Sequence, residues 1–281
     1  MERRINDTAT GRAFDVLQIS GAAGFLLIVL TAILSSHVQR HVTWLSFCIS
    51  WIISCISYTL LIFTGTNRSE HIPFALCVTQ AGLIYGAPVL TGGTTFSLAF
   101  YMYTHVKASC DCTSLRTDTF WVSLLILGPY LLGLGFFLGV LVSGIKQPSL
   151  VQKAPDYCDS TSHFPSKASA LVVALATAGV IIISVFVSVQ LYRNRRRLGD
   201  DALLVTAAIR VILFGIIGFL GLVIAAVYVI KWDLGLEFDI ILALVPNFGV
   251  VIFGSQADIL RAWIALLKRR VTPASTRNLI V

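Results

Sequence analysis

Six cysteines are the residues of this chain whose chemistry depends most on where they lie. Cys77 stands near the start of a long apolar stretch, and Cys158 lies in a polar connection between two others. If both face an oxidising compartment, they are the natural disulfide pair, and the bond would tie that connection over the apolar part of the chain. Two free thiols are the alternative. Cys48 and Cys55 lie on one predicted helical face, which is typical of small apolar packing residues.

Cys110 and Cys112 flank Asp111 directly behind another apolar stretch. Cysteines beside a membrane are substrates of palmitoylation, and two unmodified loop cysteines fit the sequence equally well. The sequence predicts no metal site and no cofactor at these residues.

The titratable side chains lie outside the apolar stretches or at their ends. This holds for all five histidines, and no carboxylate lies deep within a stretch. Proton pumps, intramembrane proteases and histidine-metal hydrolases keep such groups inside the membrane, so these classes are disfavoured. A retinal protein needs a lysine in its last span, and residues 240–257 contain none. We therefore predict that the chain is not an enzyme.

Neutral polar side chains gather within residues 74–105. Gln80, Tyr85 and Thr91 lie there on either side of Pro88, a residue that lets a membrane helix bend. We predict that these three side chains line a cavity and bind a ligand, with Asp239 offering a charge at its edge. Ordinary packing between helices is the alternative.

Seven stretches without Asp, Glu, Lys or Arg must position these residues: 16–39, 41–67, 71–106, 119–145, 168–192, 211–230 and 240–257. A membrane-spanning helix needs about 20 mainly apolar residues. Mean hydropathy is +0.84, and only 12% of the 281 residues are charged. We predict an all-α membrane protein, a seven-transmembrane helix bundle over 16–257. Its helices are expected at about 16–36, 42–64, 74–105, 120–143, 168–192, 205–230 and 238–257.

Orientation follows from the Lys and Arg residues in the connections, which stay cytoplasmic. Of 21 such residues, 12 fall on the side of the C-terminus and 8 on the other, with Arg210 inside a predicted helix. Residues 1–15 are then an extracellular tail and 271–281 a cytoplasmic one. Glycosylation sequons at Asn6 and Asn67 both fall on the predicted outer side.

The formal charge of +7 is explained without nucleic acid. The basic residues stand beside helix ends, where they set topology and meet anionic membrane lipids. Residues 258–270 place apolar side chains on one helical face, which predicts an amphipathic helix along the inner leaflet.

A basic connection follows the fifth predicted helix, and a cytoplasmic transducer could dock there. Its candidate residues are Arg193, Arg195, Arg196, Arg197 and Arg210. A stop-transfer cluster explains the arginines equally well.

Three stretches resemble a group of seven-helix, G-protein-coupled-receptor-like proteins from mushroom-forming fungi. They are His41-Val-Thr-Trp44 with Phe47-Cys-Ile-Ser-Trp-Ile52, Leu76-Cys77 with Gln80-Ala81 and Ile84-Tyr-Gly-Ala-Pro88, and Phe253-Gly254 with Asp258-Ile-Leu260. The Phe-Gly pair before an acidic residue is loosely similar to fungal pheromone receptors. The resemblance implies a plasma-membrane receptor that senses an extracellular small molecule, lipid or peptide and signals to a heterotrimeric G protein.

One departure weakens the link to G proteins. The acidic-Arg-Tyr triplet of rhodopsin-like receptors is missing, and Tyr101-Met-Tyr-Thr-His105 stands in its place. A seven-helix transporter or lipid translocator is the alternative function, and duplicated three-helix halves would favour it. The sequence contains no convincing repeat.

Overall fold

The computed structural model of the chain describes residues 2–35, 38, 40–66, 72–111, 119–153, 157–194, 202–231 and 236–271. The elements are α1 (Glu2–Leu34), α2 (Val42–Tyr58), α3 (Leu60–Phe63), α4 (Phe74–Asp111), α5 (Thr119–Lys146), the 3-10 turn η1 (Pro148–Leu150), β1 (Val151–Lys153), β2 (Cys158–Ser160), α6 (His163–Arg193), α7 (Ala202–Lys231), α8 (Leu236–Gly254) and α9 (Ala257–Val271).

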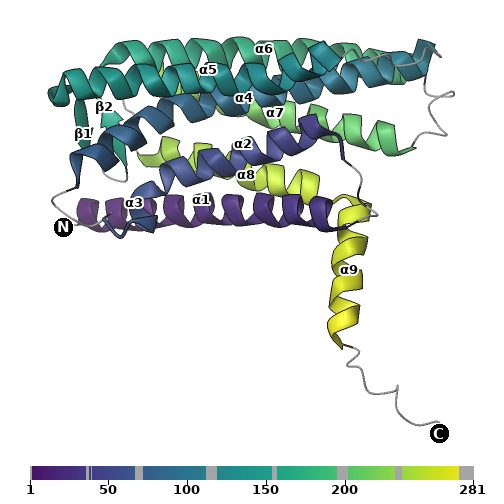
Figure 1. Cartoon of the computed structure of the whole chain (residues 1–281), viewed down its shortest axis with the longest axis horizontal. Helices are drawn as coiled ribbons and strands as arrows, with labels where there is room; N and C mark the ends of the chain where they lie inside the picture. Colours follow the sequence, from purple (N-terminus) through teal and green to yellow (C-terminus); the bar gives the residue numbers. More distant parts are fainter. Residues whose placement is uncertain are drawn as a thin grey trace, which may run out of the picture.

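The long helices run along one common direction and form a bundle (Figure 1). Five of the described helices are long and apolar enough to cross a membrane, and α8 with α9 makes a sixth if the bent pair counts as one span. Their outer faces carry large apolar side chains such as Leu131 and Leu175, which are 66% and 65% exposed. Lipid tolerates such faces, whereas water does not. The chain is a multi-pass integral membrane protein.

The two ends of the bundle differ. At one end, called here the hairpin end, β1 and β2 pair antiparallel, with Lys153 opposite Cys158. At the other, the α9 end, α8 turns into α9 through a bend of 79°. Figure 1 shows α9 leaving the bundle sideways at this end. A helix thus stands where the sequence predicts an amphipathic segment over 258–270.

Helix α4 lies at the centre and packs on α2, α5, α6 and α7. Its close approach to α5 requires glycine, because a Cβ atom on Gly86 would lie 2.8 Å from the carbonyl oxygen of Gly133. Helices α1 and α8 also approach closely, since a Cβ atom on Gly24 would lie 2.6 Å from methyl carbons of Val250. Such small-residue contacts let membrane helices pack by dispersion forces.

The first helix begins earlier than the sequence predicts. Residues 1–15 were expected to be a tail, whereas α1 starts at Glu2. No proline interrupts this segment, and the single Gly11 costs a helix only about 1 kcal/mol, so the helix continues beyond the apolar stretch that begins at residue 16.

The second helix ends earlier than predicted. A helix over 42–64 was expected, but α2 stops at Tyr58 and the short α3 follows after Thr59. Gln80 of α4 donates through Nε2 to the carbonyl oxygens of Ser57 and Tyr58, both at 3.2 Å. The last carbonyls of a helix need partners from outside it, and here another helix supplies them.

Five aromatic residues fill the middle of the bundle. This aromatic cluster consists of Phe25, Phe47, Trp51, Phe214 and Phe253. The ring of Phe47 lies 5.2 Å from Phe214 and 5.0 Å from Phe253, and Trp51 lies 5.6 Å from Phe214. Edge-to-face and tilted ring pairs at these distances are favourable beyond the area they bury, so the cluster joins α1, α2, α7 and α8.

Candidate ligand cavity

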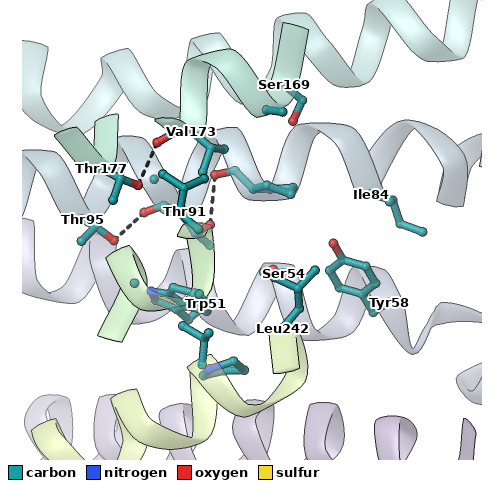
Figure 2. Close-up of a pocket in the computed structure, with 18 of the residues that line it drawn as sticks. Trp51, Ser54, Tyr58, Ile84, Thr91, Thr95, Ser169, Val173, Thr177 and Leu242 are labelled. Carbon is teal, nitrogen blue, oxygen red and sulfur yellow. Dashed lines mark hydrogen bonds between the residues drawn. The ribbon is translucent and has the colours of Figure 1, made fainter. Parts of the chain in front are cut away.

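A cavity of about 430 Å³ opens inside the bundle toward the hairpin end, between α1, α2, α4, α6, α7, α8 and the hairpin. This volume falls in the range of small-molecule pockets, about 300–1,000 Å³. Figure 2 shows side chains of α2, α4, α6 and α8 around it, among them Trp51, Thr91 and Thr177. Trp51 and Phe214 of the aromatic cluster belong to its wall.

The cavity has a row of threonine hydroxyls on α4 and α6 (Figure 2). Thr91 donates its proton to the carbonyls of Ala87 or Pro88, both at 3.1 Å. Thr95 donates to Thr91 O at 2.6 Å. Thr177 donates to Val173 O at 2.8 Å. Each hydroxyl has one proton and two lone pairs, so these oxygens offer the cavity acceptors.

A carboxylate, that of Asp159, lines the cavity on the side of the hairpin. The hydroxyl of Tyr85 donates to Asp159 Oδ1 at 2.5 Å, and the backbone N–H of Ser160 donates to the same oxygen at 2.7 Å. Ser169 of α6 donates to the carbonyl of Tyr85 at 3.1 Å. These bonds connect the hairpin, α4 and α6 around the cavity.

The predicted ligand residues divide into three groups. Tyr85 and Thr91 do line the cavity. Gln80 does not, because its amide is fully buried and bonded to α2 and to the hairpin. Asp239 falls within α8, and its side chain lies outside the described residues. Sequence reasoning missed Asp159, although its position directly after Cys158 pointed to it once the disulfide was expected.

The disulfide between Cys77 and Cys158 is present, with the two Cα atoms 5.2 Å apart. It fastens the start of β2 to the first turns of α4. The backbone N–H of Cys158 also donates to Gln80 Oε1 at 2.9 Å. One covalent bond and one buried hydrogen bond therefore hold the hairpin against α4 beside the cavity.

At the α9 end, Arg210 is a packing residue of the bundle. Its guanidinium donates to the carbonyl of Ile252, to Ser255 Oγ at 2.9 Å and to Ser255 O at 3.1 Å. These bonds join α7 to the end of α8, and the prediction that Arg210 faces a transducer stays a prediction. Last-turn carbonyls of a helix attract cations in this way.

Arg40, which lies between α1 and α2, completes this arrangement. It donates to Gln256 Oε1 and forms a salt bridge with Asp258, the second residue of α9. Trp263 of α9 donates from Nε1 to Thr31 Oγ1 of α1 at 2.7 Å. We call Ser255 and Gln256, where α8 meets α9, the elbow; Arg210 of α7 binds Ser255, and Arg40 of the α1–α2 connection binds Gln256.

Other predicted sites fall partly outside the description. Arg193 is exposed at the end of α6, and residues 195–197 lie outside the described residues. Asn67 and Cys112 also lie outside them, and Asn6 lies in α1 without a described side chain. Cys110 is buried against α6 and α7. Within the described part of the chain, no group of His, Cys, Asp and Glu is placed to hold a metal ion.

The chain matches no protein-family model and no curated protein sequence. Its functional interpretation therefore rests on the cavity and on the contacts that connect it to the α9 end.

Proposed function

We propose that the chain is a plasma-membrane receptor, similar to G-protein-coupled receptors, that binds an extracellular ligand in the cavity and signals at the α9 end. The proposal takes α2 with α3 as one span and α8 as the seventh, with α9 along the inner leaflet. It places the hairpin end outside the cell, because the disulfide lies there and the arginines at 193 and 195–197 follow α6 at the opposite end.

The observation that carries the proposal is a packed connection from the cavity to the elbow. Trp51 and Phe214 line the cavity, and both rings pack on Phe47, with centroids 6.4 and 5.2 Å away. Phe47 packs on Phe253, which lies two residues before Ser255 of the elbow. A ligand that moves Trp51 or Phe214 would disturb α8 where Arg210 holds it.

Signalling then requires two arrangements of this connection with different ligand affinities. A ligand shifts the equilibrium only by its differential affinity for the two. Release of the elbow from Arg40 and Arg210 is the proposed output, since it frees α7, α8 and α9 at the end of the bundle where α6 ends and α7 begins.

The test is nucleotide exchange on a fungal heterotrimeric G protein, with the purified chain in lipid nanodiscs. Arg210→Met should raise basal exchange, because it removes the bonds to the elbow, while Arg210→Lys should raise it less. Replacing Arg195, Arg196 and Arg197 by Ala should lower exchange. Arg12→Ala, at the hairpin end, is the matched control and should leave it unchanged.

If the chain is a transporter, none of these variants should change nucleotide exchange. The aromatic cluster packs between the cavity and the α9 end, which favours a receptor over a pathway through the bundle. The receptor proposal would be overturned if none of these variants altered nucleotide exchange under any ligand taken from the native surroundings. Flux assays in vesicles would then come next.

A further inference from the structure

The hydroxyls of the cavity wall mainly offer acceptors, and the buried Nε1–H of Trp51, which has no hydrogen-bond partner within the described part of the chain, is a donor among them. The hydroxyls of Thr91, Thr95 and Thr177 give their protons to carbonyls of their own helices. Ser169 gives its proton to Tyr85 O. Tyr85 gives its phenolic proton to Asp159. Each of these donors is engaged, whereas lone pairs of the threonine oxygens are left for a bound molecule.

Two prolines add to this imbalance. Pro88 in α4 and Pro246 in α8 have no backbone N–H, so the carbonyls of Ile84 and Leu242 lack the usual helical donor. All four residues line the cavity. A molecule that carries hydrogen-bond donors matches this wall.

The charge of the wall points the same way. Asp159 is the single ionisable acid among the described lining residues, which include no Lys, Arg or His. Both of its hydrogen bonds fall on Oδ1, and Oδ2 makes no hydrogen bond or ion pair within the described part of the chain. This second oxygen can therefore pair with a bound cation.

Aromatic rings stand beside this carboxylate. Tyr58 and Tyr157 line the cavity together with Asp159, and their ring centroids are 5.8 Å apart. Tyr157 lies two residues before Asp159, and Tyr85 is hydrogen-bonded to it. Aromatic rings that share a cavity with a carboxylate can attract an organic ammonium group through their faces.

We propose that the cavity binds an organic cation, a protonated amine carried on an apolar body. The ammonium group sits against Asp159 and the rings of Tyr58 and Tyr157. The apolar body lies deeper, against Trp51 and Phe214. This inference deepens the receptor proposal and rests on its placing the ligand in this cavity.

Three probes that differ in one group test the inference: 4-phenylbutylamine, 4-phenylbutanol and 4-phenylbutanoate. Binding to the purified chain in detergent is followed by titration calorimetry at pH 7.4. The amine should bind with a dissociation constant at least tenfold lower than that of the alcohol, and the anion should bind weakest. This comparison uses the unaltered chain and needs no variant. Equal binding of amine and alcohol, no saturable binding of the amine, or preference for the anion would overturn the proposal.

Two variants locate the effect. Asp159→Asn keeps an oxygen that accepts from Tyr85 and Ser160 but loses the charge, so the amine should lose at least tenfold in affinity while the alcohol is unaffected. Gly218→Leu fills the cavity, because a Cβ atom there meets nothing within 4 Å. It should abolish specific binding of the amine and so corrects for partition into the micelle. An amine preference that survives Asp159→Asn would overturn the assignment.

The two proposals fail separately. Amine binding that depends on Asp159, in a chain without basal or stimulated nucleotide exchange, would leave the ligand class standing and overturn the receptor. Nucleotide exchange that is stimulated by a neutral or anionic ligand and blocked by Gly218→Leu would support the receptor and overturn the assignment of an organic cation as its ligand.

Discussion

Gln80 is predicted to be a stabilising residue of the hairpin end, and replacing it by leucine should destabilise the protein markedly. Its side chain is fully buried. It accepts from Cys158 N at 2.9 Å and donates to the carbonyls of Ser57 and Tyr58, both at 3.2 Å. Leucine keeps most of the volume but makes none of these bonds.

The magnitude follows from these three bonds. Each is worth roughly 0.6–1 kcal/mol net in a membrane protein. The N–H of Cys158 would in addition stay buried without a partner, which costs about 1–3 kcal/mol. We expect Gln80→Leu to lower the free energy of unfolding by about 3 kcal/mol, since the added apolar contacts offset part of the sum. At roughly 2 °C per kcal/mol for a chain of this size, the Tm falls by about 6 °C.

The assay is thermal unfolding in detergent, followed by tryptophan fluorescence. Gln147→Leu is the matched control, because Gln147 is an exposed glutamine at the same end of the bundle, and its Tm should stay within about 1 °C. A second measurement tests the local role: the Cys77–Cys158 disulfide should be reduced faster in Gln80→Leu. A Tm drop no larger than that of the control, with unchanged reduction, would refute the reasoning.

Three further predictions concern the disulfide, the dependence of stability on pH, and helix packing. Replacing Cys77 and Cys158 by Ala removes a link across 81 residues, which should lower the free energy of unfolding by about 4 kcal/mol. Reductant should lower the stability of the wild type by the same amount and leave that of the variant unchanged. Burial holds the pKa of His41 below its ordinary value, so the unfolded chain takes up the proton first, and stability should fall as pH drops below about 6.5. His41→Asn should weaken this loss of stability at low pH, and a loss as large as that of the wild type would contradict the prediction. Gly24→Ala should cost about 1–3 kcal/mol through its clash with Val250; if adding Val250→Ala restores nothing, the clash is not the cause.

The sequence alone was sufficient for the coarse architecture. In lipid, the backbone of an apolar stretch of spanning length must form a helix, and the structure has a helix over each such stretch, although α1 begins earlier and α2 ends earlier than predicted. The disulfide was also predictable, because only Cys77 and Cys158 fell on the expected oxidising side. Tyr85 and Thr91 line a cavity, because neutral polar side chains inside a span turn toward the bundle interior; that they bind a ligand stays a prediction.

The role of Gln80 was not predictable from its position. A buried amide beside a cavity and a buried amide bonded to another helix look the same in sequence. Only the end of α2 at Tyr58 and the placement of Cys158 show which groups the amide meets. The same holds for Arg210, whose partners at Ile252 and Ser255 lie 42 and 45 residues further along the chain.

What the sequence determined by itself is therefore the bundle of long apolar helices, the disulfide pair and the kinds of polar group inside the bundle. Hydropathy and charge are properties of each segment by itself, so the sequence of a segment is enough to predict whether it forms a membrane helix. The tertiary structure alone decided which polar groups are already bonded and which face the cavity, such as Asp159. Hydrogen bonding joins residues far apart in the chain, and no local pattern records how it is satisfied.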